Sequence, residues 1–257
     1  MRRALLVLSL VLWPALARAG LTEQEIGRVA LDPPADAHVP LALRFTGLDG
    51  RPVSIGDAIA GRPTLLIPAD FTCRQICGPA LTIASSALQQ TGLAAGRDYS
   101  IVIVGIDPRD SRDDARRFTE GQIGQAGTSV LTGSQDNVQM LLDSIGYRTA
   151  FDRSRDAVAH PAAFVTLAPD GRVVRSLSSL ALQPADLRLA LLEAGDGRIG
   201  GLPGRIALLC YGFDAVHGIY TSRIAAILQL LGAATIAAMA GLIGLLLLRG
   251  KRRGASA

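Results

Sequence analysis

The 257-residue sequence has few of the side chains that build disulfide scaffolds or closed metal sites, with three cysteines and three histidines. Only three residues separate Cys73 from Cys77 in DFTCRQICGP. A disulfide between them would stabilise the fold little, because loop-closure stabilisation grows with loop length. A structural zinc site needs four protein ligands, and beyond this pair only Cys210 and the histidines remain. The pair is therefore expected to be reactive or metal-binding.

Aromatic residues and excess charge are also scarce. Aromatic side chains make up 4% of the chain, and the net charge is +4, much of it in the two termini. A basic stripe with interleaved aromatics, which would indicate a nucleic-acid-binding surface, is missing from the sequence. We therefore expect no nucleic-acid partner.

Residues 1–19, MRRALLVLSLVLWPALARA, have the pattern of a secretory signal peptide. Arg2 and Arg3 precede a short apolar run, and Ala17-Arg18-Ala19 fits the rule of small residues before a cleavage point. We expect the mature chain to begin at Gly20 and to be exported. An uncleaved N-terminal anchor is the alternative.

Residues 224–248, IAAILQLLGAATIAAMAGLIGLLLL, contain no charged side chain. At about 1.5 Å per residue, a helix of this length would cross a hydrocarbon core of roughly 30 Å. Four cations follow in the tail 249–257, which is typical of a cytoplasmic end. We predict one C-terminal transmembrane helix, rather than a buried core helix. The protein would be single-pass in a bacterial-type cytoplasmic membrane, with its main domain on the periplasmic side.

Between these segments the pattern predicts a flexible lead-in at 20–40, a folded domain at 41–194, and a linker and juxtamembrane segment at 195–223. Apolar runs alternate with helical periods along the domain, which indicates an α/β sheet with helices on its faces. In such sheets, functional residues gather at the carboxyl ends of the strands. The expected elements are a hairpin around Asp49-Gly50, strands at 64–69, 99–106 and 130–131, helices at 79–90, 111–122, 137–145 and 184–193, and a hairpin around 169–171.

The cysteine pair directly follows the first buried strand. If a helix begins near Cys73, then Cys77 at i+4 lies on the same face, and both sulfurs point the same way. The helix N-terminus and Arg74 would stabilise thiolates there. Two thiolates suit a soft ion, either Cu(I) or zinc. Spacing alone leaves a disulfide and a shared metal ion as open alternatives.

A third ligand would have to be a histidine. His160 begins a predicted strand near the central sheet and is the strongest candidate, although a lone histidine is more often structural. His38 lies in the lead-in, where we expect it to be solvated. His217 and Cys210 lie just before residues 224–248, either as part of an interfacial segment or as a transient copper or partner contact, and the sequence leaves both alternatives open.

Three stretches together resemble the Sco/SenC family: TCRQICGP after a buried strand, GIDPRD after the next, and a histidine before FVTLAPDGRV. The resemblance spans about 41–192. It implies a thioredoxin-like fold that binds copper, as Cu(I) or Cu(II), through Cys73, Cys77 and His160. It also implies that the protein delivers copper to the binuclear copper site of cytochrome c oxidase. Asp107 and Asp110 match the family's acidic turn, where they would shape the site or a docking surface, or would only cap and solvate the loop.

The resemblance implies a metallochaperone rather than an enzyme. Its partners would be the copper-binding subunit of the oxidase or another copper carrier. The alternative function is that of a thiol–disulfide reductase, which keeps the copper-ligand cysteines of the oxidase reduced through catalytic thiols at Cys73 and Cys77.

The chain departs from the family pattern at three places beside the site. Arg74 follows the first cysteine, where many members have proline, and Gly78 precedes Pro79. Pro161 follows His160. A cis proline facing the cysteines is typical of redox-active thioredoxin folds, so Pro161 in that form would favour thiol exchange.

Overall fold

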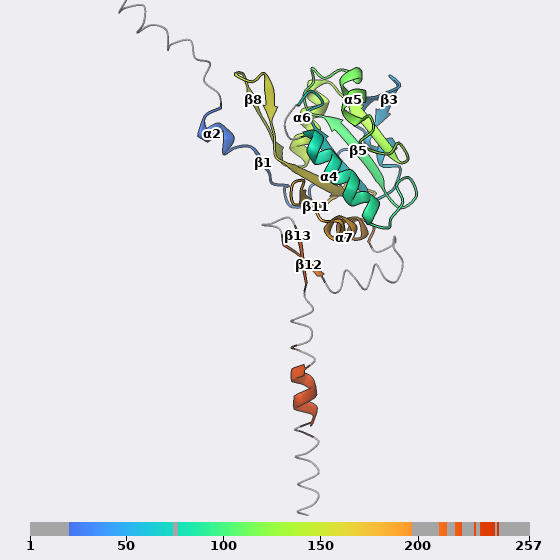
Figure 1. Cartoon of the computed structure of the whole chain (residues 1–257), viewed down its shortest axis with the longest axis vertical. Helices are drawn as coiled ribbons and strands as arrows, with labels where there is room; N and C mark the ends of the chain where they lie inside the picture. Colours follow the sequence, from blue (N-terminus) through green and yellow to red (C-terminus); the bar gives the residue numbers. More distant parts are fainter. Residues whose placement is uncertain are drawn as a thin grey trace, which may run out of the picture.

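The computed structural model describes residues 21–73, 77–196, 211–214, 219–222, 229, 232–239 and 241. A seven-stranded mixed sheet with the strand order β11-β10-β4-β5-β6-β2-β3 forms its centre (Figure 1). The three middle strands run parallel; they are β4 (Thr64–Ala69), β5 (Ser100–Gly105) and β6 (Thr128–Thr132). This arrangement confirms the predicted α/β class and places the end of β4, where the cysteine motif begins, inside the sheet.

A hairpin borders the parallel strands on each side. β2 (Arg44–Gly47) pairs antiparallel with β6 and continues into β3 (Pro52–Ser54). β10 (Ala163–Leu167) pairs antiparallel with β4 and continues into β11 (Val173–Ser178). Both hairpins were predicted from their turn residues.

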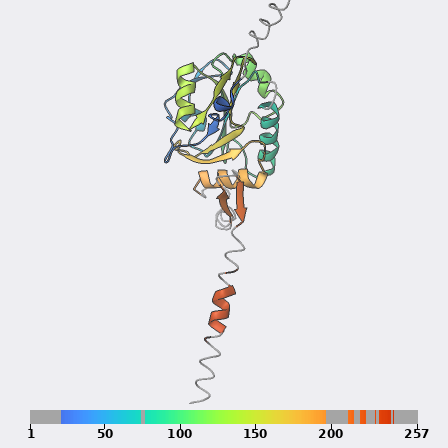
Figure 2. The ribbon, with the colours of Figure 1, turned by 90° about the vertical axis from the view of Figure 1, so that its left-hand side faces the viewer.

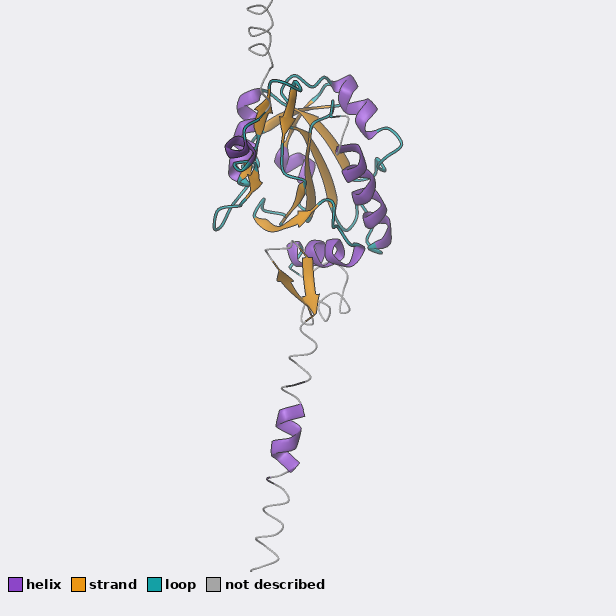
Figure 3. Ribbon diagram, turned by 60° about the vertical axis from the view of Figure 1, so that its left-hand side comes forward, coloured by secondary structure: helices purple, strands orange, loops and turns teal. Residues whose placement is uncertain are grey.

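Helices cover both faces of the sheet (Figures 2 and 3). Every residue of β4 and of β5 is buried, as expected for strands that are covered on both faces. Leu65 and Ile67 pack into one apolar core, and Leu66 packs into the other. The first core is covered by α4 (Cys77–Gln90), α5 (Arg112–Thr119) and α7 (Pro184–Ala194), and the second by α3 (Ile55–Ile59) and α6 (Gln135–Ser144).

The N-terminal segment 20–40, predicted as a flexible lead-in, contains secondary structure. It holds α2 (Glu23–Ile26) and β1 (Ala30–Leu31). β1 pairs antiparallel with β7 (Tyr147–Arg148), and the Asp32 amide donates to the carbonyl oxygen of Gly146 at 3.0 Å. This contact joins the start of the described chain to the segment that follows α6.

A separate hairpin that the sequence did not predict follows β7. It consists of β8 (Ala150–Asp152) and β9 (Ala157–Ala159), which pair antiparallel with each other outside the seven-stranded sheet. His160 comes directly after β9, so it does not begin a strand as predicted.

The C-terminal region differs from the predicted linker and transmembrane helix. β12 (Tyr211–Asp214) and β13 (Ile219–Ser222) pair antiparallel within the predicted linker 195–223. Within the described residues, no helix combines the length and the apolar composition that a membrane span requires. The longest helical stretch described inside 224–248 is 232–239, which covers roughly 12 Å.

This finding corrects two predictions, the transmembrane helix and the single-pass location in a cytoplasmic membrane. Much of 224–248 lies outside the described residues, as do the predicted signal peptide 1–19 and the tail 249–257.

The loop after β5 carries the two acidic residues of the GIDPRD stretch. Ser111 is the N-cap of α5, and its hydroxyl accepts a hydrogen bond from the Asp114 amide. Asp110 is therefore not the cap. Its carboxyl oxygen accepts a hydrogen bond from the Phe71 amide at 2.8 Å. Burial raises the pKa of Asp110 from its ordinary value of 3.8 to about 7.

The first prediction concerns the contact between the N-terminal segment and Gly146. Gly146 has φ +65°, and a Cβ added there would overlap the carbonyl group of Asp32. Gly121 has φ +69° with nothing near its Cβ position, so Gly121→Ala should cost only the left-handed backbone penalty of about 1–2 kcal/mol. Gly146→Ala should lower the free energy of unfolding by a further 1 kcal/mol or more, roughly, in urea denaturation. Equal losses in the two variants would contradict the β1–β7 contact.

The second prediction follows from the raised pKa of Asp110. Between about pH 4 and pH 7, folded Asp110 holds a proton that the unfolded chain has released, so the carboxyl contributes a loss of stability as pH rises. Asp110→Asn keeps an acceptor for the Phe71 amide but cannot titrate. In urea denaturation of the reduced, metal-free chain, the variant should gain roughly 2–4 kcal/mol relative to wild type between pH 4 and pH 8. A pH-independent difference would contradict this assignment.

Candidate metal centre

Cys73 is placed by a turn at the carboxyl end of β4. The Asp70 side chain, which is 1% exposed, accepts hydrogen bonds at 2.9 Å from both the amide and the hydroxyl of Thr72. The Cys73 amide then donates to the carbonyl oxygen of Asp70 at 3.2 Å. Aspartate commonly stabilises turns in this way. The turn brings the half-buried Cys73 thiol back over the end of the sheet.

Cys77 is the first described residue of α4 and is 4% exposed. Residues 74–76, including Arg74, lie outside the described part of the chain. Cys73 lies in a turn and Cys77 lies in α4. The predicted helix that would carry both cysteines on one face falls on residues outside the described part of the chain.

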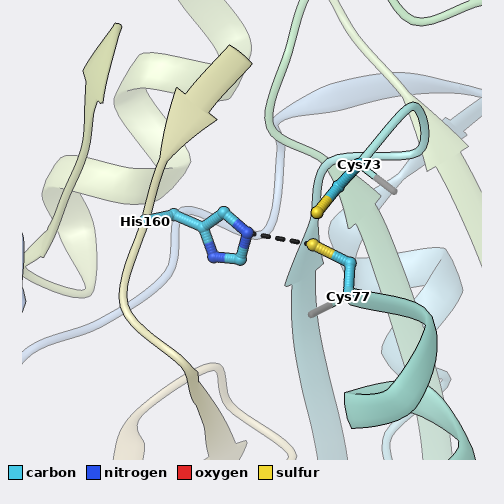
Figure 4. Close-up of side chains that lie close together, drawn as sticks. All are labelled: Cys73, Cys77 and His160. Carbon is cyan, nitrogen blue, oxygen red and sulfur yellow. Dashed lines mark hydrogen bonds between the residues drawn. The ribbon is translucent and has the colours of Figure 1, made fainter. Parts of the chain in front are cut away.

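His160 completes the group from the opposite side (Figure 4). It lies between β9 and β10, and its Nε2 is 3.0 Å from Cys77 Sγ. One ligand atom from each of Cys73, Cys77 and His160 lies within 4.8 Å of the other two. Among the described residues, this is the one group of three or more such side chains close enough to hold a metal ion. The three predicted site residues thus converge.

Tyr147 orients the imidazole ring. Its hydroxyl lies 2.9 Å from His160 Nδ1 and donates to the carbonyl oxygen of Pro161 at 2.7 Å. The same carbonyl oxygen lies 3.0 Å from Nδ1. Because the tyrosine has one proton and the carbonyl can only accept, all three groups are satisfied when Nδ1 carries the hydrogen. Nε2 then presents its lone pair toward Cys77, in the tautomer that a metal ligand needs.

The Cys77 thiol and the Tyr147 hydroxyl, which both contact His160, are held in their protonated forms. The pKa of Cys77 is raised above its usual range, first by its hydrogen bond with Cys73 and then by burial. Burial also raises the pKa of Tyr147, which is 1% exposed. A metal ion bound to Cys77 would therefore have to displace its proton.

The two sides of the group differ in their surroundings. Behind Cys77 and His160 the lining is mainly apolar; it includes Ile67, Pro68, Ala80, Ala163 and Phe164. In front, Cys73 and His160 border a more open cleft with polar and charged walls, including Asp70, Thr72, Asp152, Arg155 and Asp156. An ion or a partner thiol would therefore reach the group from the side of Cys73.

Other residues singled out by the sequence lie elsewhere. His38 is exposed, and its Nδ1 pairs with the carbonyl oxygen of Asp36 at 2.7 Å. Cys210 and His217 are outside the described residues. The peptide bond before Pro161 is trans, because the described chain contains no cis peptide bond. The cis proline considered from the sequence is therefore ruled out.

Asp107 and Asp110 are buried in the loop after β5 but do not belong to the group of ligands. Burial tends to raise the pKa of Asp107, but hydrogen bonds from Arg109 hold it below its ordinary value. Sequence reasoning missed Arg109, which pairs with Asp107, and Tyr147, which contacts the His160 ring. The only signal for Tyr147 was a large aromatic side chain directly after Gly146, at the end of a predicted helix.

Solved structures from several organisms have the same fold. A putative electron transfer protein from Aquifex aeolicus VF5 is 21% identical, with a TM-score of 0.58, and the match covers 65% of this chain and 98% of that one. ScoI from Arabidopsis thaliana with copper bound is 19% identical, with a TM-score of 0.52, covering 63% and 99%. At these identities the likeness establishes the fold.

A third structure is BsSco, described as a member of the Sco family of cytochrome c oxidase assembly proteins that has a disulfide switch. It is 22% identical, with a TM-score of 0.52, and the match covers 64% of this chain and 96% of that one. The comparison with curated proteins gave no match. These likenesses agree with the predicted thioredoxin-like fold.

The SCO1/SenC family model matches residues 34–191. This range is more than half of the chain, and it contains both cysteines, the acidic loop and His160. The match confirms the resemblance inferred from the three motifs. The chain therefore belongs to the SCO1/SenC family.

Proposed function

We propose that the protein binds copper through Cys73, Cys77 and His160 and delivers it during assembly of the binuclear copper site of cytochrome c oxidase. The observation that carries the proposal is the convergence of two thiols and one imidazole within 4.8 Å at the end of β4. These ligands come from three separate segments, which the fold brings together over one edge of the sheet.

The set of donor atoms suits Cu(I). Thiolates are soft ligands that select Cu(I) or zinc, and imidazole is accepted by both metals. A structural zinc site would need a fourth protein ligand, and the described residues supply three. The hydrogen bonds of Tyr147 prepare Nε2 of His160 as a neutral ligand, as is common around metal-binding histidines.

Delivery requires that the ion can leave as well as bind. Cys77 is buried against the apolar side of the group, whereas Cys73 and His160 border the open cleft. A partner could replace ligands from this side while Cys77 still holds the ion. The partners that fit this role are the copper-binding subunit of the oxidase and another copper carrier. Family membership and the description of BsSco as an oxidase assembly protein support this role.

The difference in exposure of the two thiols also favours a second candidate function, thiol–disulfide reduction. The thiolate of half-buried Cys73 would attack a disulfide of the oxidase subunit, form a mixed disulfide and release one partner thiolate. Cys77 would then attack the Cys73 sulfur and release the second thiolate, leaving a Cys73–Cys77 disulfide. Each cycle oxidises the pair by two electrons, so a cellular dithiol reductant must restore it.

The third prediction is that His160→Ala lowers Cu(I) affinity about 100-fold or more, because the variant loses one of three ligands. Affinity is measured on the reduced full chain under anaerobic conditions, by competition with a chromophoric Cu(I) chelator. His38→Ala makes the same change at an exposed histidine and should bind as wild type does. Cys77→Ser should lose its tightly bound equivalent of Cu(I).

The same variant separates the two candidate functions. Thiol exchange needs the sulfurs but not the imidazole, so His160→Ala should leave the disulfide-exchange rate nearly unchanged. If Cu(I) binding survived in His160→Ala, the copper role of His160 would be refuted.

The fourth prediction concerns the tautomer set by Tyr147. Tyr147→Phe removes the hydroxyl but leaves the Pro161 carbonyl near Nδ1. We expect Cu(I) affinity to fall about 10-fold, as for other residues that orient metal ligands. Tyr99→Phe is the matched control, since Tyr99 is also buried but precedes β5 at the opposite end of the strands. Equal affinities in the two variants would refute the orienting role.

A further inference from the structure

The loop after β5 contacts both halves of the candidate metal centre. On one side, Asp110 accepts the hydrogen bond from the Phe71 amide, two residues before Cys73. On the other side, Arg109 reaches the β8–β9 hairpin, which leads directly into His160. The loop is therefore placed to fix the distance between the cysteine turn and the histidine.

Arg109 is itself firmly anchored. Its Nε lies 2.9 Å from one carboxylate oxygen of Asp107, and its Nη2 lies 2.6 Å from the other. Asp107 is 4% exposed, and two-point contacts between arginine and carboxylate fix the direction of the guanidinium group. The pKa of Asp107 stays below its ordinary value despite its burial, so the pair remains charged.

The same guanidinium group contacts two residues of the hairpin, and one of these contacts is from Nη2 to the carbonyl oxygen of Asp156 at 3.3 Å. Nη1 donates to a carboxylate oxygen of Asp156 at 2.7 Å. The guanidinium carbon lies 4.9 Å from the centre of the Phe151 ring, within the range of a cation–π contact. Phe151 lies in β8 and Asp156 lies in the turn just before β9, so one side chain contacts both a strand and the turn of the hairpin.

The hairpin needs such support. It projects from the central sheet (Figure 1), and within the described residues β8 and β9 pair only with each other. An isolated two-stranded hairpin is marginally stable in water, and the contact of half-buried Val158 with the second core adds to the support from Arg109. His160 follows its last residue, Ala159, so motion of the hairpin would move the imidazole away from the cysteines.

We propose that Arg109 is a positioning residue that clamps the β8–β9 hairpin to the loop after β5 and so sets His160 against the cysteine pair. This inference rests on the proposed copper site. Apparent affinity falls in proportion to the fraction of molecules in which the ligands are assembled. Loosening the clamp therefore weakens copper binding without removing a ligand.

Because the Arg109–Asp156 ion pair is exposed, breaking it can change the position of the hairpin with little effect on the stability of the whole fold. The Asp156 side chain is 78% exposed and that of Arg109 50% exposed, and exposed ion pairs contribute little to global stability. Asp156→Asn removes the charge but keeps a residue that tolerates the positive φ of 50° at this position. It also leaves the Arg109–Asp107 contact in place.

The test compares Asp156→Asn, Phe151→Ala and Arg109→Gln in the reduced full chain. Cu(I) affinity is measured by chelator competition, together with the melting temperature and amide hydrogen exchange across 150–159. We expect affinity to fall about 3–10-fold for the first two variants and at least 10-fold for Arg109→Gln, with faster exchange in the hairpin. Phe151→Tyr keeps the aromatic face and should restore binding.

Two controls separate a positioning effect from a general effect of losing charge or stability. Asp113→Asn breaks another exposed ion pair, with Arg116 on α5, and should change neither affinity nor hairpin exchange. The melting temperature reports the stability of the whole fold and should stay close to the wild-type value in the clamp variants, because the ion pair is exposed. A purely structural defect would instead lower the melting temperature and the affinity together.

The outcomes separate the clamp from the copper site. If His160→Ala loses Cu(I) affinity but Asp156→Asn and Arg109→Gln bind as wild type does, the clamp is overturned and the proposed function stands. If His160→Ala keeps wild-type affinity, both the ligand set and the clamp built on it are overturned. If the clamp variants lose affinity only in step with their melting temperature, the positioning role is overturned.

Discussion

The hydrogen bond between His160 Nε2 and Cys77 Sγ, 3.0 Å long, is the interaction on which the candidate metal centre depends. This hydrogen bond joins the segment after β9 to the first residue of α4. The Tyr147 hydroxyl contacts Nδ1 on the other side of the imidazole ring and so fixes which nitrogen faces Cys77. Because Tyr147 is buried and paired with the Pro161 carbonyl, the imidazole has one favoured tautomer. The site is thus preorganised for an ion that replaces the Cys77 proton.

The sheet explains why these groups meet. β4 and β5 run parallel inside the sheet, so the turn that carries Cys73 and the loop that carries Arg109 leave from the same edge. Functional groups commonly collect at this edge in α/β proteins. The buried acids Asp70 and Asp110 tie these connections together by accepting backbone hydrogen bonds. A rigid sheet thereby supports a site whose ligands lie on turns and at a helix end.

The three residues that converge could be singled out from the sequence because each lies near a strong local signal and matches a family motif. Cys73 and Cys77 follow an apolar strand, and His160 precedes a hairpin with a clear turn. The geometry between them could not be predicted, because it depends on contacts distant in sequence. The β8–β9 hairpin has two strands of only three residues each, and it is held by Arg109, which is distant in the sequence. The transmembrane helix predicted from 224–248 was wrong, because no helix of the described residues has the length and apolar composition of a membrane span. Hydropathy reports only a preference for lipid.

The central claim is that one copper ion is held by two sulfurs and one imidazole nitrogen. X-ray absorption at the copper edge of the Cu(I)-loaded full chain measures this directly. The account predicts two sulfur neighbours and one nitrogen neighbour with the outer-shell scattering of an imidazole ring, and loss of that nitrogen signal in His160→Ala. A copper ion coordinated by sulfur alone in the wild-type chain would contradict the account.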